Sequence, residues 1–210
     1  EISGVDHVVS INLPDNNLDG PLPELSDLPE LRSLIIYSTN GGTSHLSGPI
    51  PSLSALTKLK SLSLAGNFGL SGPIPSLAGL TDLREFRVNH NNLTGQLPDL
   101  SGSPLLTHFW AHNNQLSGGI PPLTGLTALQ EFRVQVNGLS NSLPALTGLT
   151  ALKVFRAESN QLTGSLPNAS LNGTDTPALE DYEAYDNLLT GTLPTLPGLT
   201  ISRPSRSRTR

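Results

Sequence analysis

Apolar residues return at fixed intervals along most of this chain, and polar residues separate them in the same order each time. In the segment Leu83-Arg-Glu-Phe86-Arg-Val88-Asn, apolar and polar residues alternate, a period of two that is typical of a half-buried β-strand. An asparagine, a leucine, a glycine and a proline then follow. The pattern predicts a short strand whose apolar side faces a core, followed by a turn.

The full pattern, L-x-x-L-x-L-x-x-N-x-L-x-G-x-(I/L)-P-x-L-x-x-L, recurs eight times at spacings of 23 to 28 residues. The units begin at Val8, Leu31, Leu59, Leu83, Leu106, Leu129, Leu152 and Leu179. Such a repeat is typical of a leucine-rich repeat solenoid, because each unit is too small to bury its own apolar face and stacking closes one continuous core. We therefore predict one elongated domain over residues 8–201, between an N-terminal edge at 1–7 and a basic, disordered tail at 202–210.

The turn residues refine this prediction. Glycine permits positive φ, and the proline that follows it fixes φ and prevents a long helix. In the sixth unit Asn141 takes the glycine position, which asparagine tolerates better than most residues. We expect an α/β-type, mostly β solenoid, a right-handed superhelix with one concave parallel β-sheet and short 3₁₀ or extended segments on its convex side.

The asparagine after each strand is expected to turn inward, where its amide can satisfy backbone groups left unpaired as the chain bends. These positions are Asn16, Asn67, Asn91, Asn114, Asn137, Asn160 and Asn187. Their role is therefore predicted to be structural.

The segments Asn91-Asn-Leu-Thr-Gly-Gln-Leu-Pro98 and Leu70-Ser-Gly-Pro-Ile-Pro75 resemble the plant-type class of leucine-rich repeats, found in receptor-kinase ectodomains and polygalacturonase-inhibiting proteins. The resemblance implies a secreted, extracellular or cell-surface protein that acts in host–microbe or cell-surface recognition. Two departures are the regular unit, one residue shorter than the usual plant repeat, and the absence of cysteine-paired caps. A microbial secreted member of the class is therefore at least as compatible with the sequence.

Polar strand positions should point to the concave face, where one column contains Arg87, Trp110, Arg133 and Arg156 on neighbouring strands about 4.8 Å apart. Tryptophan and arginine often dominate the binding energy of protein interfaces. The only tryptophan of the chain thus falls at a solvent-facing position between arginines. The predicted partner-binding residues are Arg87, Trp110, Arg133, Arg156, His108, His112, Glu131, Glu158, Tyr185 and Tyr37.

Two interpretations of this surface stay open. In the first, Arg133 and Arg156 receive a carboxylate or phosphate of a partner through bidentate hydrogen bonds. In the second, Trp110 only packs on the arginine stems in a cation–π stack, and the charges form a solvated lattice of salt bridges. The corresponding alternative function is a structural or adhesive segment of a larger surface protein.

Other candidate chemistry is sparse. Sequons for N-glycosylation begin at Asn92, Asn168 and Asn172. His90, His108 and His112 should lie near one another, but a zinc site would need a further ligand, for which Glu85 is the only obvious candidate, so neither a metal nor another cofactor is expected. The chain has no nucleophile elbow, phosphate loop or metalloprotease motif, which argues against an enzyme.

A column of mostly hydroxyl residues supplies one further alternative. It comprises Asp19, Ser47, Ser71, Thr94, Ser117, Ser140, Thr163 and Thr190. A flat ladder of hydroxyl groups could bind ice, although serine and threonine are ordinary occupants of this position in the plant-type repeat.

Charge and composition narrow the class of partner. The net charge is -5, and four of the 12 basic residues are the tail arginines Arg203, Arg206, Arg208 and Arg210, which leaves residues 1–201 with 8 basic and 17 acidic groups. Such a body repels nucleic acid, and no apolar run is long enough for membrane insertion. Cysteine is absent, so bridges do not indicate the redox compartment. We expect a monomer that binds a protein, with a glycan as the alternative ligand.

Overall fold

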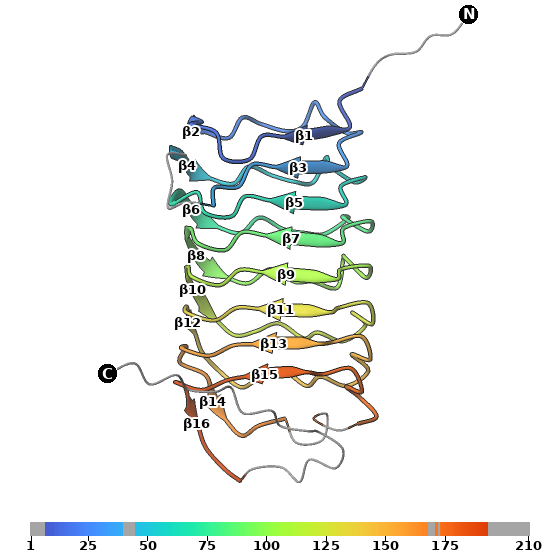
Figure 1. Cartoon of the computed structure of the whole chain (residues 1–210), viewed down its shortest axis with the longest axis vertical. Helices are drawn as coiled ribbons and strands as arrows, with labels where there is room; N and C mark the ends of the chain where they lie inside the picture. The colour runs from blue at the N-terminus through green and yellow to red at the C-terminus, as the bar shows by residue number, and fades with distance from the viewer. Residues whose placement is uncertain (1–6, 40–44, 168–170, 172, 193–210) are drawn as a thin grey trace, which may run out of the picture.

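The structure is a computed structural model that describes residues 7–39, 45–167, 171 and 173–192. Its first sheet has eight parallel strands that follow one another in chain order along the length of the molecule (Figure 1). They are β1 (Ser10–Asn12), β3 (Ser33–Ile35), β5 (Ser61–Ser63), β7 (Glu85–Arg87), β9 (His108–Trp110), β11 (Glu131–Arg133), β13 (Val154–Arg156) and β15 (Asp181–Glu183). The predicted mostly β parallel solenoid is confirmed.

The middle residue of each strand in this sheet points into the core. Phe86, Phe109, Phe132 and Phe155 are fully buried, and their rings stack at centroid distances of 5.5, 5.4 and 5.6 Å. The ring of Tyr182 continues the stack at 5.1 Å. Each ring therefore covers the next, so the core grows by addition along the solenoid.

The inward asparagines join successive turns of the chain. The Nδ2 group of Asn137 donates to the carbonyl oxygens of Val134, at 3.1 Å, and of Ala111 in the preceding turn, also at 3.1 Å. Its Oδ1 atom accepts the backbone N–H of Leu116 at 2.9 Å. This confirms the predicted inward position, which is shared by Asn67, Asn91, Asn114, Asn160 and Asn187. Asn16 differs, because it is exposed and donates only to the nearby carbonyl of Pro14 at 3.0 Å.

A second parallel sheet lies beside the first and was not predicted from the sequence. Its six strands are β2 (Asp19–Pro21), β4 (His45–Pro49), β6 (Gly69–Pro73), β8 (Asn92–Gln96), β10 (Gln115–Gly118) and β12 (Gly138–Leu139). A separate pair of strands continues towards the C-terminal end, β14 (Thr163–Gly164) and β16 (Leu188–Leu189). The alternation of apolar and polar residues is too short in these segments to indicate a strand.

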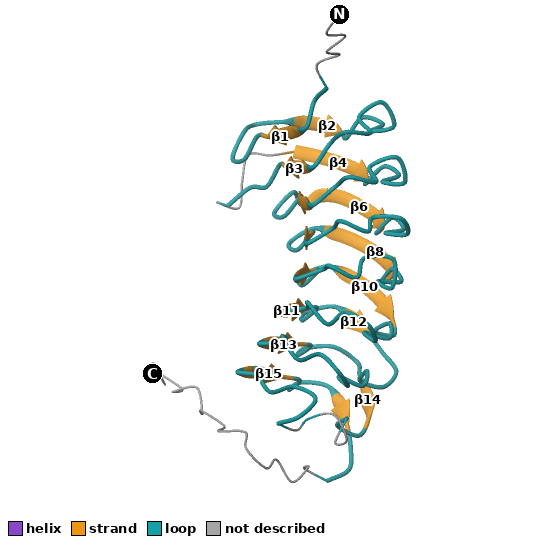
Figure 2. Cartoon of the chain, turned by 90° about the vertical axis from the view of Figure 1, so that its right-hand side faces the viewer, coloured by secondary structure: helices purple, strands orange, loops and turns teal. Residues whose placement is uncertain are grey.

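The registers of the two sheets explain why the solenoid curves. In the first sheet equivalent residues pair directly, such as Phe86 with Phe109, so each turn advances by about 4.8 Å. In the second sheet Thr94 pairs with Pro73 rather than with the equivalent Ser71, a stagger of two residues. Two residues span about 6.6 Å along a strand, which separates equivalent positions by about 8 Å. The wider spacing on this side places the eight-stranded sheet on the inside of the curve (Figure 2).

The convex side differs in one respect from the prediction of 3₁₀ pieces. Pairs of consecutive turns form there, as when Leu56 N–H donates to Leu53 O at 2.9 Å and Leu59 N–H donates to Leu56 O at 2.9 Å. No stretch of the described residues continues far enough to form a helix. The expected positive φ at the turn position is confirmed, including φ 65° at Asn141.

Candidate binding surface on the concave sheet

The first and third residues of each strand in the eight-stranded sheet point away from the core. The register pairs Glu85 with His108 and Arg87 with Trp110, and then Trp110 with Arg133. The side chains of Arg87, Trp110 and Arg133 consequently form one row across β7, β9 and β11. This is the row that the sequence predicted at the centre of the concave face.

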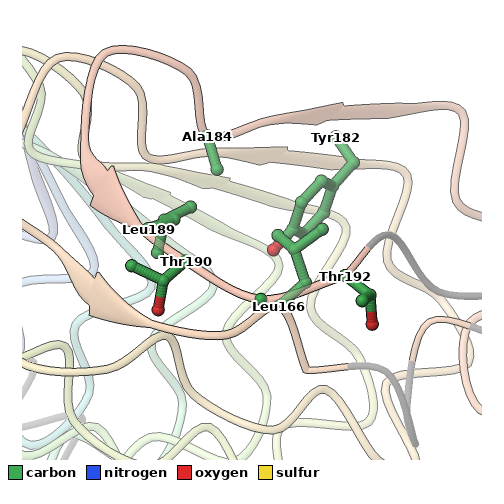
Figure 3. A pocket seen from close by; sticks show the side chains of 7 residues that line it. Leu166, Tyr182, Ala184, Leu189, Thr190 and Thr192 are labelled. Atoms are coloured by element: carbon green, nitrogen blue, oxygen red, sulfur yellow. The ribbon is translucent and has the colours of Figure 1, made fainter.

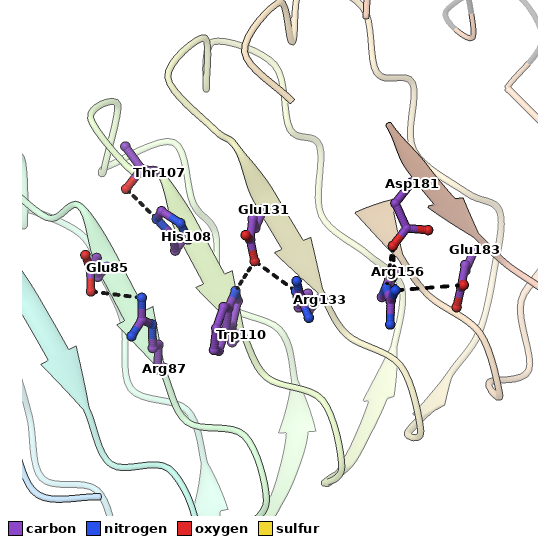
Figure 4. A network of polar contacts seen from close by, with 10 residues as sticks. All are labelled: Glu85, Arg87, Thr107, His108, Trp110, Glu131, Arg133, Arg156, Asp181 and Glu183. Carbon is purple, nitrogen blue, oxygen red and sulfur yellow. Dashed lines mark hydrogen bonds and ion pairs between the residues drawn. The ribbon is translucent and has the colours of Figure 1, made fainter. Parts of the chain in front are cut away.

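Trp110 is half-buried and held between two guanidinium groups. The Cζ atoms of Arg87 and Arg133 lie 4.4 and 4.9 Å from the indole centroid, within the range of a cation–π interaction. The indole Nε1 donates a hydrogen bond to Oε2 of Glu131 at 3.1 Å, and the same oxygen accepts Nε of Arg133 at 2.9 Å (Figure 4). One carboxylate thus fixes the orientation of both side chains.

Carboxylates already engage the arginines of this row. Arg87 lies 3.2 Å from Glu85, while Arg156 lies 2.5 Å from Asp181 and 3.9 Å from Glu183. Half-exposed pairs of this kind contribute little to stability, at most about 1 kcal/mol each. Bidentate binding of a partner anion by Arg133 and Arg156 stays a prediction. A partner anion would have to displace Glu131 or Asp181.

A second row follows the first on the same face and contains Asn89, His112, Gln135 and Glu158. Asn89, Gln135 and Glu158 are only 8%, 9% and 6% exposed. Each of the four side chains has a buried polar atom without a hydrogen-bond partner among the described residues, namely Oδ1, Nδ1, Oε1 and Oε2 in that order. We call these four side chains the acceptor row.

Burial also changes the proton affinity of two members of the acceptor row. Desolvation, together with the charges of His90, Arg133 and Arg156, lowers the pKa of His112 to about 4. The ring of His90 lies against His112, with a centroid distance of 5.1 Å. Desolvation raises the pKa of Glu158, and the carboxylate of Glu183 adds to the effect.

The other predicted residues lie on the same face but farther from the tryptophan. His108 Nδ1 lies 2.9 Å from Thr107 Oγ1, and its ring is 6.3 Å from that of Trp110. Tyr37 follows β3, near the N-terminal end, and Tyr185 follows β15, where it is 59% exposed. The predicted residues therefore form a strip along the sheet rather than a compact cluster.

The predicted site residues omitted Asn89 and Gln135. Both occupy the column that also contains His112 and Glu158, so the repeat alignment placed them correctly without indicating that they are buried. The signal that could have found them is a continuous run of polar residues in one column.

The three sequons have different outcomes. Asn92 lies in β8, where its Nδ2 group donates to the carbonyl oxygen of Phe68 at 2.6 Å. Asn168 and Asn172 lie outside the described residues, as do the predicted tail at 202–210 and residues 1–6 of the N-terminal edge. Glycosylation at these positions stays a prediction.

The described residues hold no group of three or more histidine, aspartate or glutamate side chains that could bind a metal ion. They also contain no apolar helix of the length needed to cross a bilayer.

The hydroxyl column lies on the second sheet, but it does not run straight across the strands. Ser71 pairs with Asn92 and Ser117 pairs with Gln96, so successive hydroxyl residues are offset diagonally. Their backbone positions are about 8 Å apart, because of the two-residue stagger.

Several solved structures are similar to this chain. One is the plant peptide hormone receptor RGFR1 in complex with RGF2, with 33% identity and a TM-score of 0.80 over 88% of this chain and 29% of the receptor. Another is the Arabidopsis receptor kinase HAESA in complex with the peptide hormone IDA and the co-receptor SERK1, with 30% identity, a TM-score of 0.75, and 88% and 35% coverage. A plant ice-binding protein has 26% identity and a TM-score of 0.60 over 90% of this chain and 67% of that protein.

The chain spans about a third of the length of either receptor structure. No protein-family model matches it, and no curated protein matches its sequence. Three observations indicate the same fold: the parallel β ladder, the inward asparagines and the likeness to receptor ectodomains. The protein has a leucine-rich repeat solenoid fold, similar to that of plant receptor ectodomains.

Proposed function

We propose that the protein is a non-enzymatic recognition scaffold that binds a protein or peptide partner on its concave sheet, around Trp110. The observation that carries the proposal is the indole held between Arg87 and Arg133, with Glu131 fixing its orientation. Holding a large aromatic side chain in one conformation before binding lowers the entropy cost of binding. Tryptophan and arginine are also the residue types that most often dominate interface energetics.

The stacking geometry favours a protein partner over a glycan. A sugar ring would need a free face of the indole, and both faces of Trp110 already carry a guanidinium group from a neighbouring strand. The likeness to two receptors whose structures contain bound peptide hormones points the same way. A cell-wall glycan is the alternative ligand.

Charge along the sheet restricts the partner further. The centre of the face combines Trp110 with two arginines, whereas Asp181, Glu183 and Asp186 make the C-terminal end acidic. Complementary potentials steer association and suppress wrong partners. The partner segment accordingly carries acidic groups towards the centre and basic groups towards β15, and a uniform polyanion does not match.

The biological setting follows from the same likenesses. We infer that the protein acts outside the cell or at its surface, as the receptor ectodomains among its structural neighbours do, in host–microbe or cell-surface contact. A polygalacturonase-inhibitor-like protein or a microbial secreted protein of this repeat class fits that setting.

Capture of the partner tests the proposal. The immobilised protein is exposed to extracellular extract, bound proteins are identified by mass spectrometry, and their affinity is measured by surface plasmon resonance. Trp110→Ala combined with Arg133→Ala is expected to weaken binding by roughly 30-fold or more, the equivalent of about 2 kcal/mol. The control is Lys58→Ala, which removes an exposed ion pair with Glu30 outside the concave sheet.

Equal binding by the double variant and the control would refute recognition through this surface. Adhesion to a cell surface that survives the double substitution would instead favour the structural or adhesive alternative.

Ice binding is a second candidate function, which the likeness to a plant ice-binding protein supports. The hydroxyl column on the second sheet would be the contact surface, but its diagonal offset separates successive hydroxyl positions by about 8 Å. A thermal-hysteresis measurement decides this candidate, since a freezing-point gap that Thr94→Leu abolishes would support it.

A further inference from the structure

Glu158 is a buried carboxylate that the described part of the chain compensates only in part, through its own backbone N–H and the charge of Arg156. Its side chain is 6% exposed, and its Oε2 atom has no hydrogen-bond partner. None of the ion pairs among the described residues involves it. A buried carboxylate oxygen without a hydrogen-bond partner is unfavourable, so such atoms are usually paired when the protein is in its working state.

Arg156, the cation whose charge acts on Glu158, already has other partners. Arg156 donates through Nε and Nη2 to Asp181, at 2.8 and 2.5 Å, and also lies 3.9 Å from Glu183. Desolvation raises the pKa of Tyr185, and the negative charges of Glu158, Glu183 and Asp186 add to the effect. The surroundings are therefore acidic beyond these pairs. This end of the face has more carboxylates than the single guanidinium can neutralise.

A second unpartnered acceptor lies beside Glu158. Arg133 pairs with Arg156 in the sheet, and beyond this pair Val134 N–H donates to Arg156 O at 2.8 Å and Val136 N–H donates to Glu158 O at 3.0 Å. The side chains of Gln135 and Glu158 therefore stand on adjacent segments about 4.8 Å apart. Oε1 of Gln135 is buried and accepts no hydrogen bond within the described residues. The two acceptors form the acidic end of the acceptor row.

We propose that Glu158 and Gln135 form a subsite that receives the guanidinium of an arginine side chain from the partner bound on the concave sheet. This inference rests on the proposed function and adds the chemistry of one partner residue to it. A guanidinium has five N–H donors in a planar fork, so it can donate to the carboxylate and to the amide oxygen together. The compact ammonium group of lysine lacks this fork.

Tyr185 supplies the outer wall of the subsite. It follows β15, one strand beyond Glu158, and Ser159 N–H donates to its carbonyl oxygen at 3.0 Å. The side chain is 59% exposed, which leaves its ring available to an arriving cation. The arginine would neutralise Glu158 while Arg156 keeps its own pairs with Asp181 and Glu183.

Direct titration with a small probe tests the subsite without the natural partner. N-acetyl-L-arginine amide is added to the full chain at pH 7, and binding is followed by NMR through the amide signals of Gln135, Ser159 and Tyr185. N-acetyl-L-citrulline amide has nearly the same shape but no charge. The variant is Glu158→Gln, which keeps the size and one acceptor, and its control is Glu24→Gln at an exposed glutamate away from the sheet.

We expect saturable shifts with the arginine derivative in the unmodified protein and in Glu24→Gln. Binding should be at least tenfold weaker for the citrulline derivative and for Glu158→Gln, because both remove the charge-assisted hydrogen bond. Absence of saturable binding, equal binding of the two probes, or unchanged binding by Glu158→Gln would each overturn the proposal.

Thermal melting of Glu158→Gln shows whether the variant is folded. We expect a melting temperature at least as high as that of the unmodified protein. The experiment also separates this inference from the proposed function. Partner capture that depends on Trp110 together with no arginine binding refutes only the subsite. Arginine binding without any captured partner refutes the proposed function and leaves the subsite.

Discussion

Single residues show how one insertion disturbs a repeated hydrogen bond. In most turns Oδ1 of the inward asparagine accepts a leucine N–H from the preceding turn, as Asn114 does from Leu93 at 3.0 Å. The segment Asn67-Phe-Gly-Leu70 has one residue more than its equivalents, and Leu70 N–H donates to Asn67 O at 2.9 Å instead. Oδ1 of Asn91 consequently has no partner within the described chain. One added residue therefore removes one bond and leaves the ladder intact.

His112 should make folding stability sensitive to mild acid. Its pKa is about 4 in the folded protein and about 6.5 in an unfolded chain, so its contribution to stability is fully present above pH 6.5 and is lost as the pH falls towards 4. Between pH 7.5 and 4.5 the unmodified protein should lose about 2.5 kcal/mol more than His112→Gln in urea titrations.

The effect of Glu158 has the opposite sign. Its folded-state pKa is raised, so the stability it contributes is present at low pH and is lost as the pH rises above about 4.5. Because both proteins keep Glu158, its effect cancels in the comparison. The same pH dependence in both proteins would contradict the assignment of a depressed pKa to His112.

At the scale of the element, the turn after each strand has a conserved geometry within this chain. The residue before the repeated asparagine has positive φ at Asp15, Gly66, His90, Asn113, Val136, Ser159 and Asp186, although Asn16 itself is exposed. The geometry allows the asparagine to turn back beneath the strand. At Gly66 a side chain would also collide, because a Cβ atom would lie 2.1 Å from the carbonyl oxygen of Ser38. No single amino-acid preference reveals this position.

Val136 occupies that turn position at a cost. It has φ 55°, which is rare for a β-branched residue, and it is 45% exposed, so little packing offsets the strain. Asn113 adopts φ 54° at the equivalent position. Val136→Asn should therefore stabilise the protein by about 1 kcal/mol and raise its melting temperature by a few degrees.

Val9→Asn is the matched control, since Val9 is 48% exposed but does not have positive φ. It should give no increase in melting temperature. If Val136→Asn melts at or below the temperature of the unmodified protein, backbone strain at this turn is not significant.

At the scale of the whole molecule, the core of the described residues is complete in the middle and less covered near β15. Phe109 and Ala111 are fully buried, whereas the equivalent Tyr182 and Ala184 are only partly covered. A pocket of about 330 Å³ lies at that end, lined by Leu166, Tyr182, Ala184, Leu189, Thr190, Gly191 and Thr192 (Figure 3). Each turn of a solenoid is stabilised by its neighbours, so the described turns near this end should open most readily.

Hydrogen exchange measures this difference between two similar amides. Val88 N–H donates to Trp110 O, and Ala157 N–H donates to Glu183 O, both at 2.8 Å and both in fully buried residues. Ala157 should exchange at least roughly tenfold faster, because only β15 follows it in the sheet. Equal exchange rates would indicate that the solenoid opens as one unit.

The sequence by itself determined the strand order, the inward asparagines and the identity of both concave rows, because each follows from a repeated period and from the alternation of side chains along a strand. Only the tertiary structure decided the second sheet and its two-residue stagger, since these depend on how turns stack rather than on local pattern. It also decided that Glu131 fixes Trp110 and Arg133, and that Oε2 of Glu158 lies buried without a hydrogen-bond partner among the described residues. Pairing and burial are properties of neighbouring strands taken together, and no single repeat contains them.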